Sequence, residues 1–274
     1  MRKYLTFPNI ALVVGLLFLY LPIFSMIVFS FNNSRLVTVW DAANSPTLKW
    51  YFALFQDRPV LQAAWLSIRI AAIAATGAVV LGTLAGLVLA RFGPFRGRAL
   101  LQGLSTAPLV MPEVITGLSM LLLFVSMEQM LRALFGWQFD RGMLTITLAH
   151  ITFTMAYVTV VVQSRLAGMD QSLEEAAMDL GARPVRVFFD ITIPVMAPAL
   201  IAGWLLAFTL SLDDLVVASF VTGPGASTLP MVIFSKVRLG VSPDINALAT
   251  IIIVIVALGV AISSWAIRRS ARRG

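Results

Sequence analysis

The chain has 274 residues, of which 59% are hydrophobic and only 12% are charged, and its formal net charge is +7. Soluble domains carry about 25% charged residues, so the composition excludes a soluble enzyme, a disordered protein and a nucleic-acid-binding domain, and predicts a polytopic membrane protein. Because the chain has no cysteine and a single histidine, disulfides, thiolate metal sites and histidine-rich metal clusters are also excluded.

Six stretches are apolar over the length of about 20 residues that a helix needs to cross a bilayer. They lie approximately at 10–31, 63–90, 104–126, 143–163, 196–222 and 246–267. The first stretch is longer than the core of a signal peptide, which has roughly 7–15 residues, so we interpret it as an uncleaved span. The predicted fold is all-α, a bundle of six transmembrane helices that forms a single domain over residues 1–274.

The basic residues indicate the orientation of these spans. Twelve of them lie in the two termini and in the loops 91–101 and 164–195, whereas seven lie in the opposite loops. Loops that are richer in lysine and arginine face the cytoplasm. Both termini and the loop 164–195 are therefore predicted to be cytoplasmic.

The loop 164–195 has the pattern of a short helix. Ser172 is a candidate N-cap, and Glu175, three residues later, would complete a capping box. Leu173, Ala176, Ala177 and Leu180 share one apolar face, and Gly181 is a natural residue to follow the helix end. Such a face fits a groove on a partner protein, but a helix lying on the lipid surface or against the base of the bundle has the same pattern.

The same loop resembles a known family at fixed spacing. Glu175, Ala176 and Ala177 are followed after three residues by Gly181, and after nine more by the segment Ile191 to Pro194. This pattern is similar to the EAA loop of ATP-binding-cassette importer permeases, except that Ile193 stands where leucine is usual. The resemblance implies a coupling helix that docks on a separate ATPase subunit. Its site residues would be Glu174, Glu175, Ala176, Ala177, Gly181 and Pro194.

Other segments resemble the polyamine branch of this family, and within it the second permease subunit of putrescine importers. They are 30–34, 107–113, 140–145, 212–215 and 242–247. The resemblance implies a type I importer permease in the bacterial inner membrane that moves putrescine or a related polyamine by alternating access. Its partners would be two copies of an ATPase subunit that hold ATP and magnesium, a homologous sister permease and a periplasmic binding protein. The chain itself would bind no cofactor or metal, contact no nucleic acid and have no catalytic residue.

Three acidic residues lie inside predicted spans, where a charge usually faces a cavity or a partner. They are Glu113, Asp213 and Asp214, and acids along a polyamine path would replace the water that the cation loses. Alternatively, one aspartate caps a helix break or pairs with Arg69 or with the sister subunit. His150, also within a span, is more simply explained as a packed polar residue than as a proton relay.

Two other classes of function are alternatives. A self-sufficient secondary transporter or channel for a small cation would use Asp213, Asp214 and His150 as a proton-coupled site, but it would give the EAA loop no role. An intramembrane hydrolase or transferase lacks a nucleophile–base pair or a metal set. None of the three lysines follows a glycine, so the chain has no Walker motif and another chain must handle ATP.

Overall fold

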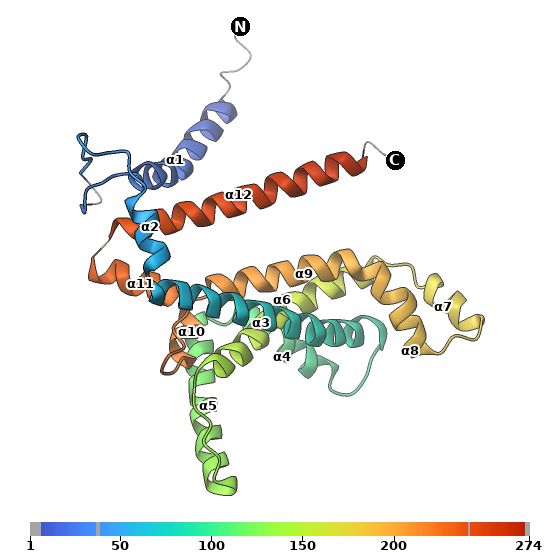
Figure 1. Ribbon diagram of the computed structural model, residues 1–274. Helices are drawn as coiled ribbons and strands as arrows, with labels where there is room; N and C mark the ends of the chain where they lie inside the picture. The colour runs from blue at the N-terminus through green and yellow to red at the C-terminus, as the bar shows by residue number, and fades with distance from the viewer. Residues whose placement is uncertain (1–6, 37–38, 241, 272–274) are drawn as a thin grey trace. The chain divides into compact units, whose positions relative to one another are not determined.

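The computed structural model describes residues 7–36, 39–240 and 242–271, with side chains up to Leu258 in the last helix. Every regular element in these ranges is a helix, as predicted (Figure 1). The described residues of Met1–Leu61 and Ile233–Gly274 form one compact unit, and Gln62–Val232 form a second. The prediction of a single domain stays a prediction.

The larger unit is built around α6 (Met143–Ala167). It also contains most of α3 (Arg58–Arg91), α4 (Arg98–Val110), α5 (Glu113–Phe135), α7 (Ser172–Asp179), α8 (Pro184–Val187), the π-helix η1 (Phe188–Thr192), α9 (Ile193–Asp213) and α10 (Val216–Val221). Helix α6 runs beside α9 and also contacts α4 and α10, while α10 packs against α5 (Figure 1). Two apolar cores both draw side chains from α3 and α6. One adds residues from α5 and α10, and the other adds residues from α9.

Two glycines let α3 approach α6 closely. A Cβ atom on Gly82 would lie 2.8 Å from the Cβ of Val158, and one on Gly86 would lie 2.6 Å from Cγ1 of Val162. Glycine pairs spaced by four residues permit such close backbone approach in membrane helices. The sequence pattern Gly82-x-x-x-Gly86 therefore marks a packing face of α3.

We expect Gly86→Ala to destabilise the protein by about 1–3 kcal/mol, because the added methyl group overpacks the contact with Val162. The matched control is Gly103→Ala in α4, where a Cβ atom would meet nothing within 4 Å. Both changes add the same helix propensity, so the difference between their thermal unfolding midpoints in detergent isolates the packing cost. Equal midpoints would contradict the close contact.

Two of the predicted spans are interrupted in the structure, which corrects their bounds. The stretch 104–126 is divided at Met111 and Pro112, so that α4 ends at Val110 and a separate helix α5 begins at Glu113. Proline has no N–H and disfavours helical geometry in the residue before it, and Met111 is accordingly extended, with ψ of 136°. The stretch 196–222 is divided at Asp214, which is extended with ψ of 127°.

The smaller unit contains α1 (Phe7–Phe29), α2 (Lys49–Gln56), part of α11 (Leu229–Leu239) and α12 (Pro243–Ala271). Helix α12 contacts both α1 and α2. The ammonium group of Lys236 lies 2.6 Å from a carboxylate oxygen of Asp57 and 2.7 Å from one of Asp244. Burial by itself would lower the pKa of Lys236, but the bonds to the two aspartates outweigh it and raise that pKa. The lysine therefore ties α11 to the end of α2 and the start of α12.

Five helices in the described part of the chain are long and apolar enough to cross a membrane. They are Phe7–Phe29, Arg58–Arg91, Glu113–Phe135, Met143–Ala167 and the continuous helical run Pro184–Asp213. A shorter apolar helix, Pro243–Leu258, covers the part of α12 whose side chains are described. These six helices correspond to the six predicted spans, with shifted ends. Of the basic residues used for orientation, Arg2, Lys3, Arg272 and Arg273 lie outside the described residues.

Candidate functional site

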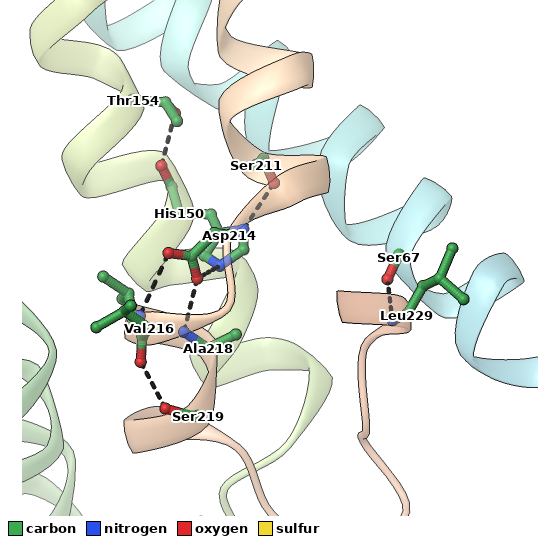
Figure 2. Close-up of polar contacts among 10 residues, drawn as sticks. Ser67, His150, Thr154, Ser211, Asp214, Val216, Ala218, Ser219 and Leu229 are labelled. Atoms are coloured by element: carbon green, nitrogen blue, oxygen red, sulfur yellow. Dashed lines mark hydrogen bonds and ion pairs between the residues drawn. The ribbon is translucent and has the colours of Figure 1, made fainter. Parts of the chain in front are cut away.

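Asp214 occupies the break between α9 and α10. One of its carboxylate oxygens accepts a hydrogen bond from the backbone N–H of Val217 at 3.3 Å, and the other accepts one from Ala218 at 2.7 Å (Figure 2). These N–H groups belong to the first turn of α10, where helical partners are missing. The carboxylate therefore caps α10, which is the alternative that the sequence left open for an aspartate at this position.

His150 of α6 holds both sides of this break. Its Nε2 atom lies 3.2 Å from Oδ2 of Asp214, and its Nδ1 atom lies 2.6 Å from Oγ of Ser211 in α9 (Figure 2). The histidine is 1% exposed, so the interaction is shielded from water. This pairing is not evident from the sequence, because Ser211 and Asp214 are 61 and 64 positions away from His150. The spacing of three residues between Ser211, near the end of α9, and Asp214, directly after α9, was the available signal. Among the described residues, Arg69 forms no ion pair with Asp213 or Asp214.

Replacing His150 with alanine should destabilise the protein by about 1–3 kcal/mol, since buried oxygens of Asp214 and Ser211 would each lose a hydrogen-bonding partner. Thr152→Ala in the same helix is the control, because the Thr152 hydroxyl is exposed and bonds only to the backbone of Leu148. Thermal unfolding of the purified protein in detergent measures both effects. A His150→Ala midpoint equal to that of Thr152→Ala would show that the interaction does not stabilise the break.

A cavity of about 270 Å³ lies beside the break and brings together the three predicted intramembrane acids. Glu113 comes from the start of α5, Asp213 from the end of α9, and Asp214 from the break itself. Two aromatic side chains of α6, Phe153 and Tyr157, also line it. The remaining lining residues are Pro108, Met111, Thr116, Leu210, Leu215, Val216 and Val217.

The charges of this cavity favour a cation. Its lining includes three carboxylates and no lysine or arginine. Asp214 is already engaged by His150 and α10, whereas Glu113 and Asp213 form no ion pair within the described part of the chain. Aromatic ring faces attract ammonium groups within about 6 Å. The arrangement can therefore bind an organic ammonium ion between the two free carboxylates and the two rings.

The predicted EAA loop folds into α7, α8 and η1, but α7 begins differently from the prediction. Ser172 is the first helical residue and is not an N-cap, and the capping box with Glu175 is absent from the structure. Instead, the backbone N–H of Ser172 donates to the carboxylate of Asp170 at 3.0 Å. This hydrogen bond lowers the pKa of Asp170. The aspartate two residues upstream thus provides a charged acceptor at the start of the helix, where backbone N–H groups lack helical partners.

Gly181 ends α7 as the sequence predicts. Its φ angle is +86°, in the left-handed region that favours glycine. The N–H of Ala182 donates to the carbonyl of Ala177 at 3.0 Å, and the N–H of Gly181 donates to that of Met178 at 2.9 Å. This pair of bonds is the Schellman motif. The glycine thus turns the chain sharply from α7 into α8.

The two adjacent glutamates of α7 have different surroundings. Glu175 is exposed, whereas the side chain of Glu174 is 15% exposed. One oxygen of Glu174 accepts a hydrogen bond from the Thr192 hydroxyl at 2.8 Å, and the other lies 3.4 Å from Nε of Arg91. Neither Arg91 nor Thr192 was predicted as a site residue.

The outer surface of the loop is apolar and uncovered in this chain. Leu173 is 51% exposed, Leu180 is 91% exposed, and Val185 and Phe189 are also exposed. Ala176 is exposed beside them and Ala177 is half-buried, while Pro194 lies exposed in the first turn of α9. A small connecting loop with this much exposed apolar surface has the character of a contact surface for another molecule.

Residues 78–273 match the family described as the binding-protein-dependent transport system inner membrane component. The match covers most of the chain, including α6, the EAA loop and the cavity residues. The chain belongs to this family. The resemblance to ATP-binding-cassette importer permeases is thereby confirmed, and the binding-protein-dependent permease is a multi-pass protein of the inner membrane.

Named relatives of this permease agree with the assignment. The putrescine transport system permease protein PotI of Escherichia coli K12 is 58% identical over 244 residues, which cover 89% of this chain and 84% of the relative. The spermidine/putrescine transport system permease protein PotC of the same strain is 41% identical over 257 residues, covering 94% and 92%.

Solved structures show the same fold at low sequence identity. A crystal structure of a bacterial ABC transporter involved in alginate import aligns with a TM-score of 0.70 at 16% identity, over 94% of this permease and 93% of that chain. The predicted all-α permease fold is confirmed by this likeness.

Proposed function

We propose that this permease is a transmembrane subunit of an ATP-driven importer that carries putrescine or a related polyamine by alternating access. The observation that carries the proposal is the cavity that is lined by Glu113, Asp213, Phe153 and Tyr157 and by no basic residue. A diamine has two ammonium groups joined by an apolar chain. Carboxylates would offset the lost hydration of the ammonium groups, and the rings would pack against the methylene groups. The identity to PotI supports the same substrate class.

The exposed apolar surface of α7 and α8 supports docking on a separate ATPase. In the proposed assembly, two copies of that ATPase bind ATP and magnesium, a homologous sister permease completes the pathway, and a periplasmic binding protein delivers the substrate. The chain itself has no catalytic role. Glu175, Ala176 and Ala177 would contact the ATPase, with Gly181 fixing the turn and Pro194 leading into the span. ATP would drive transport only by favouring one conformation of the permease over another.

The proposed orientation places both termini and the EAA loop in the cytoplasm. It is supported by the excess of arginine and lysine in those segments. With this orientation, Lys236 and its two aspartates lie on the periplasmic side, where the binding protein would dock.

A gradient-driven transporter is the second candidate, and the buried contact between His150 and Asp214 is the observation that favours it. However, Asp214 also accepts two backbone hydrogen bonds from α10, which gives the pair a structural role that needs no proton transfer. The exposed apolar loop would have no function in such a protein. The ATP-driven importer accounts for both features.

Purification from native membranes in mild detergent tests the proposed assembly. We expect this permease to elute in one complex with an ATPase and a second permease. A permease that elutes alone and moves putrescine in liposomes without ATP would support the gradient-driven transporter instead.

A further inference from the structure

We infer that Glu174 is a positioning residue that ties the coupling helix to α9, which lines the substrate cavity, and to α3, which packs against the lining helix α6. The inference rests on the proposed function, because it assigns to one side chain the transfer of movement from the ATPase to the pathway. We call the contact set of Glu174, Arg91 and Thr192 the α7 latch.

The latch joins three elements through one carboxylate. Glu174 lies in the first turn of α7, Arg91 is the last residue of α3, and Thr192 ends η1, directly before α9. Each carboxylate oxygen is used once, by the Thr192 hydroxyl at 2.8 Å and by the Arg91 guanidinium at 3.4 Å. The side chains of Glu174 and Arg91 are 15% and 12% exposed, and Thr192 is 2% exposed. Because the contacts are largely shielded from water, salt screens them less than it screens surface ion pairs.

From the latch, two packed routes reach the cavity. Helix α3 is held against α6 by the close contacts of Gly82 with Val158 and of Gly86 with Val162. Helix α6 carries Phe153 and Tyr157, which line the cavity. On the other route, Thr192 continues into α9, which ends in Asp213 at the same cavity. A rigid displacement of α7 would therefore move an aromatic wall and an acidic wall of the cavity together.

Two features give the latch room to change its geometry. Nε and Nη2 of Arg91 are buried and have no hydrogen-bond acceptor within the described residues, so the ion pair with Glu174 is not a closed, two-bond contact. Between Phe188 and Thr192 the helix is a π-helix, and such wide turns are frequent at functional sites. Pro194 follows it and lacks the N–H that would donate to the carbonyl of Asp190 in a regular helix. The coupling helix is thus attached to α9 through a segment whose backbone hydrogen bonding is irregular, which allows its hydrogen-bond pattern to shift.

The neighbouring glutamate serves a different purpose. Glu175 is exposed, so it is available to the ATPase. Glu174 is directed into the permease and is not free for an intermolecular contact. Adjacent residues on a helix point about 100° apart, which allows one pair of glutamates to face both the ATPase and the spans.

The test compares variants of the complete importer, reconstituted with its ATPase, sister permease and binding protein, for putrescine taken up per ATP hydrolysed. Glu174→Gln should lower this ratio by about 2- to 30-fold, the range seen for residues that carry coupling between sites. Arg91→Gln should lower it similarly, and the double variant should be no worse than either single one, because both remove the same contact. ATP hydrolysis itself should stay within about twofold.

Arg186→Gln is the matched control. It removes another ion pair of the same loop, with Asp190 at 3.0 Å, but one in which both side chains are largely exposed. Its uptake per ATP should equal that of the wild type. If Glu174→Gln fails to assemble, Thr192→Val carries the test, since it removes one hydroxyl and little volume.

The outcomes distinguish failure of the proposed function from failure of the α7 latch. A wild-type importer without ATP-dependent putrescine uptake would overturn the proposed function. A wild type that transports, together with Glu174→Gln or Thr192→Val variants whose uptake per ATP is unchanged, would overturn the latch alone. Additive losses in the double variant would also overturn it.

Discussion

Replacing Glu113 with glutamine and Asp213 with asparagine in the same permease should reduce putrescine uptake by about 100-fold or more. Each change keeps the size of the side chain but removes a carboxylate that would bind an ammonium group. Hydrogen bonds to charged groups contribute about 1.5–3 kcal/mol, or roughly 10- to 100-fold each. Uptake of labelled putrescine into cells that express the whole importer measures the effect, and each single variant should lie between the wild type and the double variant.

Glu128→Gln is the control for this experiment. Glu128 lies in α5, like Glu113, but it faces Arg132 at 3.9 Å and does not line the cavity. Its uptake should match the wild type. If the double variant assembles normally and transports at the wild-type rate, the cavity is not on the substrate pathway.

Asp214 should respond differently from Asp213, although the two are adjacent. Its carboxylate accepts hydrogen bonds from the start of α10 and contacts His150. Replacing Asp214 should therefore disturb the helix break whether or not this residue contacts the substrate. Loss of uptake in an Asp214 variant is therefore not evidence for substrate contact unless stability is measured as well.

The second large effect is expected at the exposed apolar surface of α7 and α8. Leu180→Asp should abolish co-purification of the ATPase with this permease. Leu180 is 91% exposed in the chain, so the substitution does not disturb its fold. Burying a leucine side chain in an interface is worth about 1.5–3 kcal/mol, and an unpaired carboxylate in its place adds a desolvation cost. Together these terms weaken binding by more than about 100-fold.

Leu239→Asp provides a matched control, because Leu239 is 88% exposed and ends α11, on the opposite side of the membrane in the proposed orientation. The ATPase should co-purify with this variant as it does with the wild type. Equal recovery of the ATPase with Leu180→Asp and Leu239→Asp would contradict docking on α7.

Much of the fold can be predicted from the sequence, because bilayer thickness sets the length of apolar helices. Glycine also marks positions that need a positive φ angle or a close approach of two helices. Gly181 ends α7 with a positive φ angle, and Gly86 permits a close helix contact. Both roles depend on local spacing. The interruptions at Met111 and Asp214 were harder to place, since hydropathy continues across them and only the local backbone chemistry of proline and aspartate reveals the break.

Long-range partners are the part of the site that the sequence does not reveal. His150 meets Asp214 across 64 positions, and Thr192 meets Glu174 across 18. Each residue alone has an ordinary polar pattern, and its role depends on which helices pack together. The grouping of Glu113 with Asp213 in one cavity has the same origin, because the break after α9 and the proline break before α5 bring two helix ends to one place.

Reconstitution of the purified complex in liposomes tests the central claim most directly. Labelled putrescine uptake is measured with binding protein outside and ATP inside, with and without ATP, and with the Glu113→Gln and Asp213→Asn double variant in parallel. The proposed function predicts uptake by the wild type only when ATP is present, and about 100-fold less uptake by the double variant. Equal uptake with and without ATP, or no putrescine uptake by an intact complex, would contradict it.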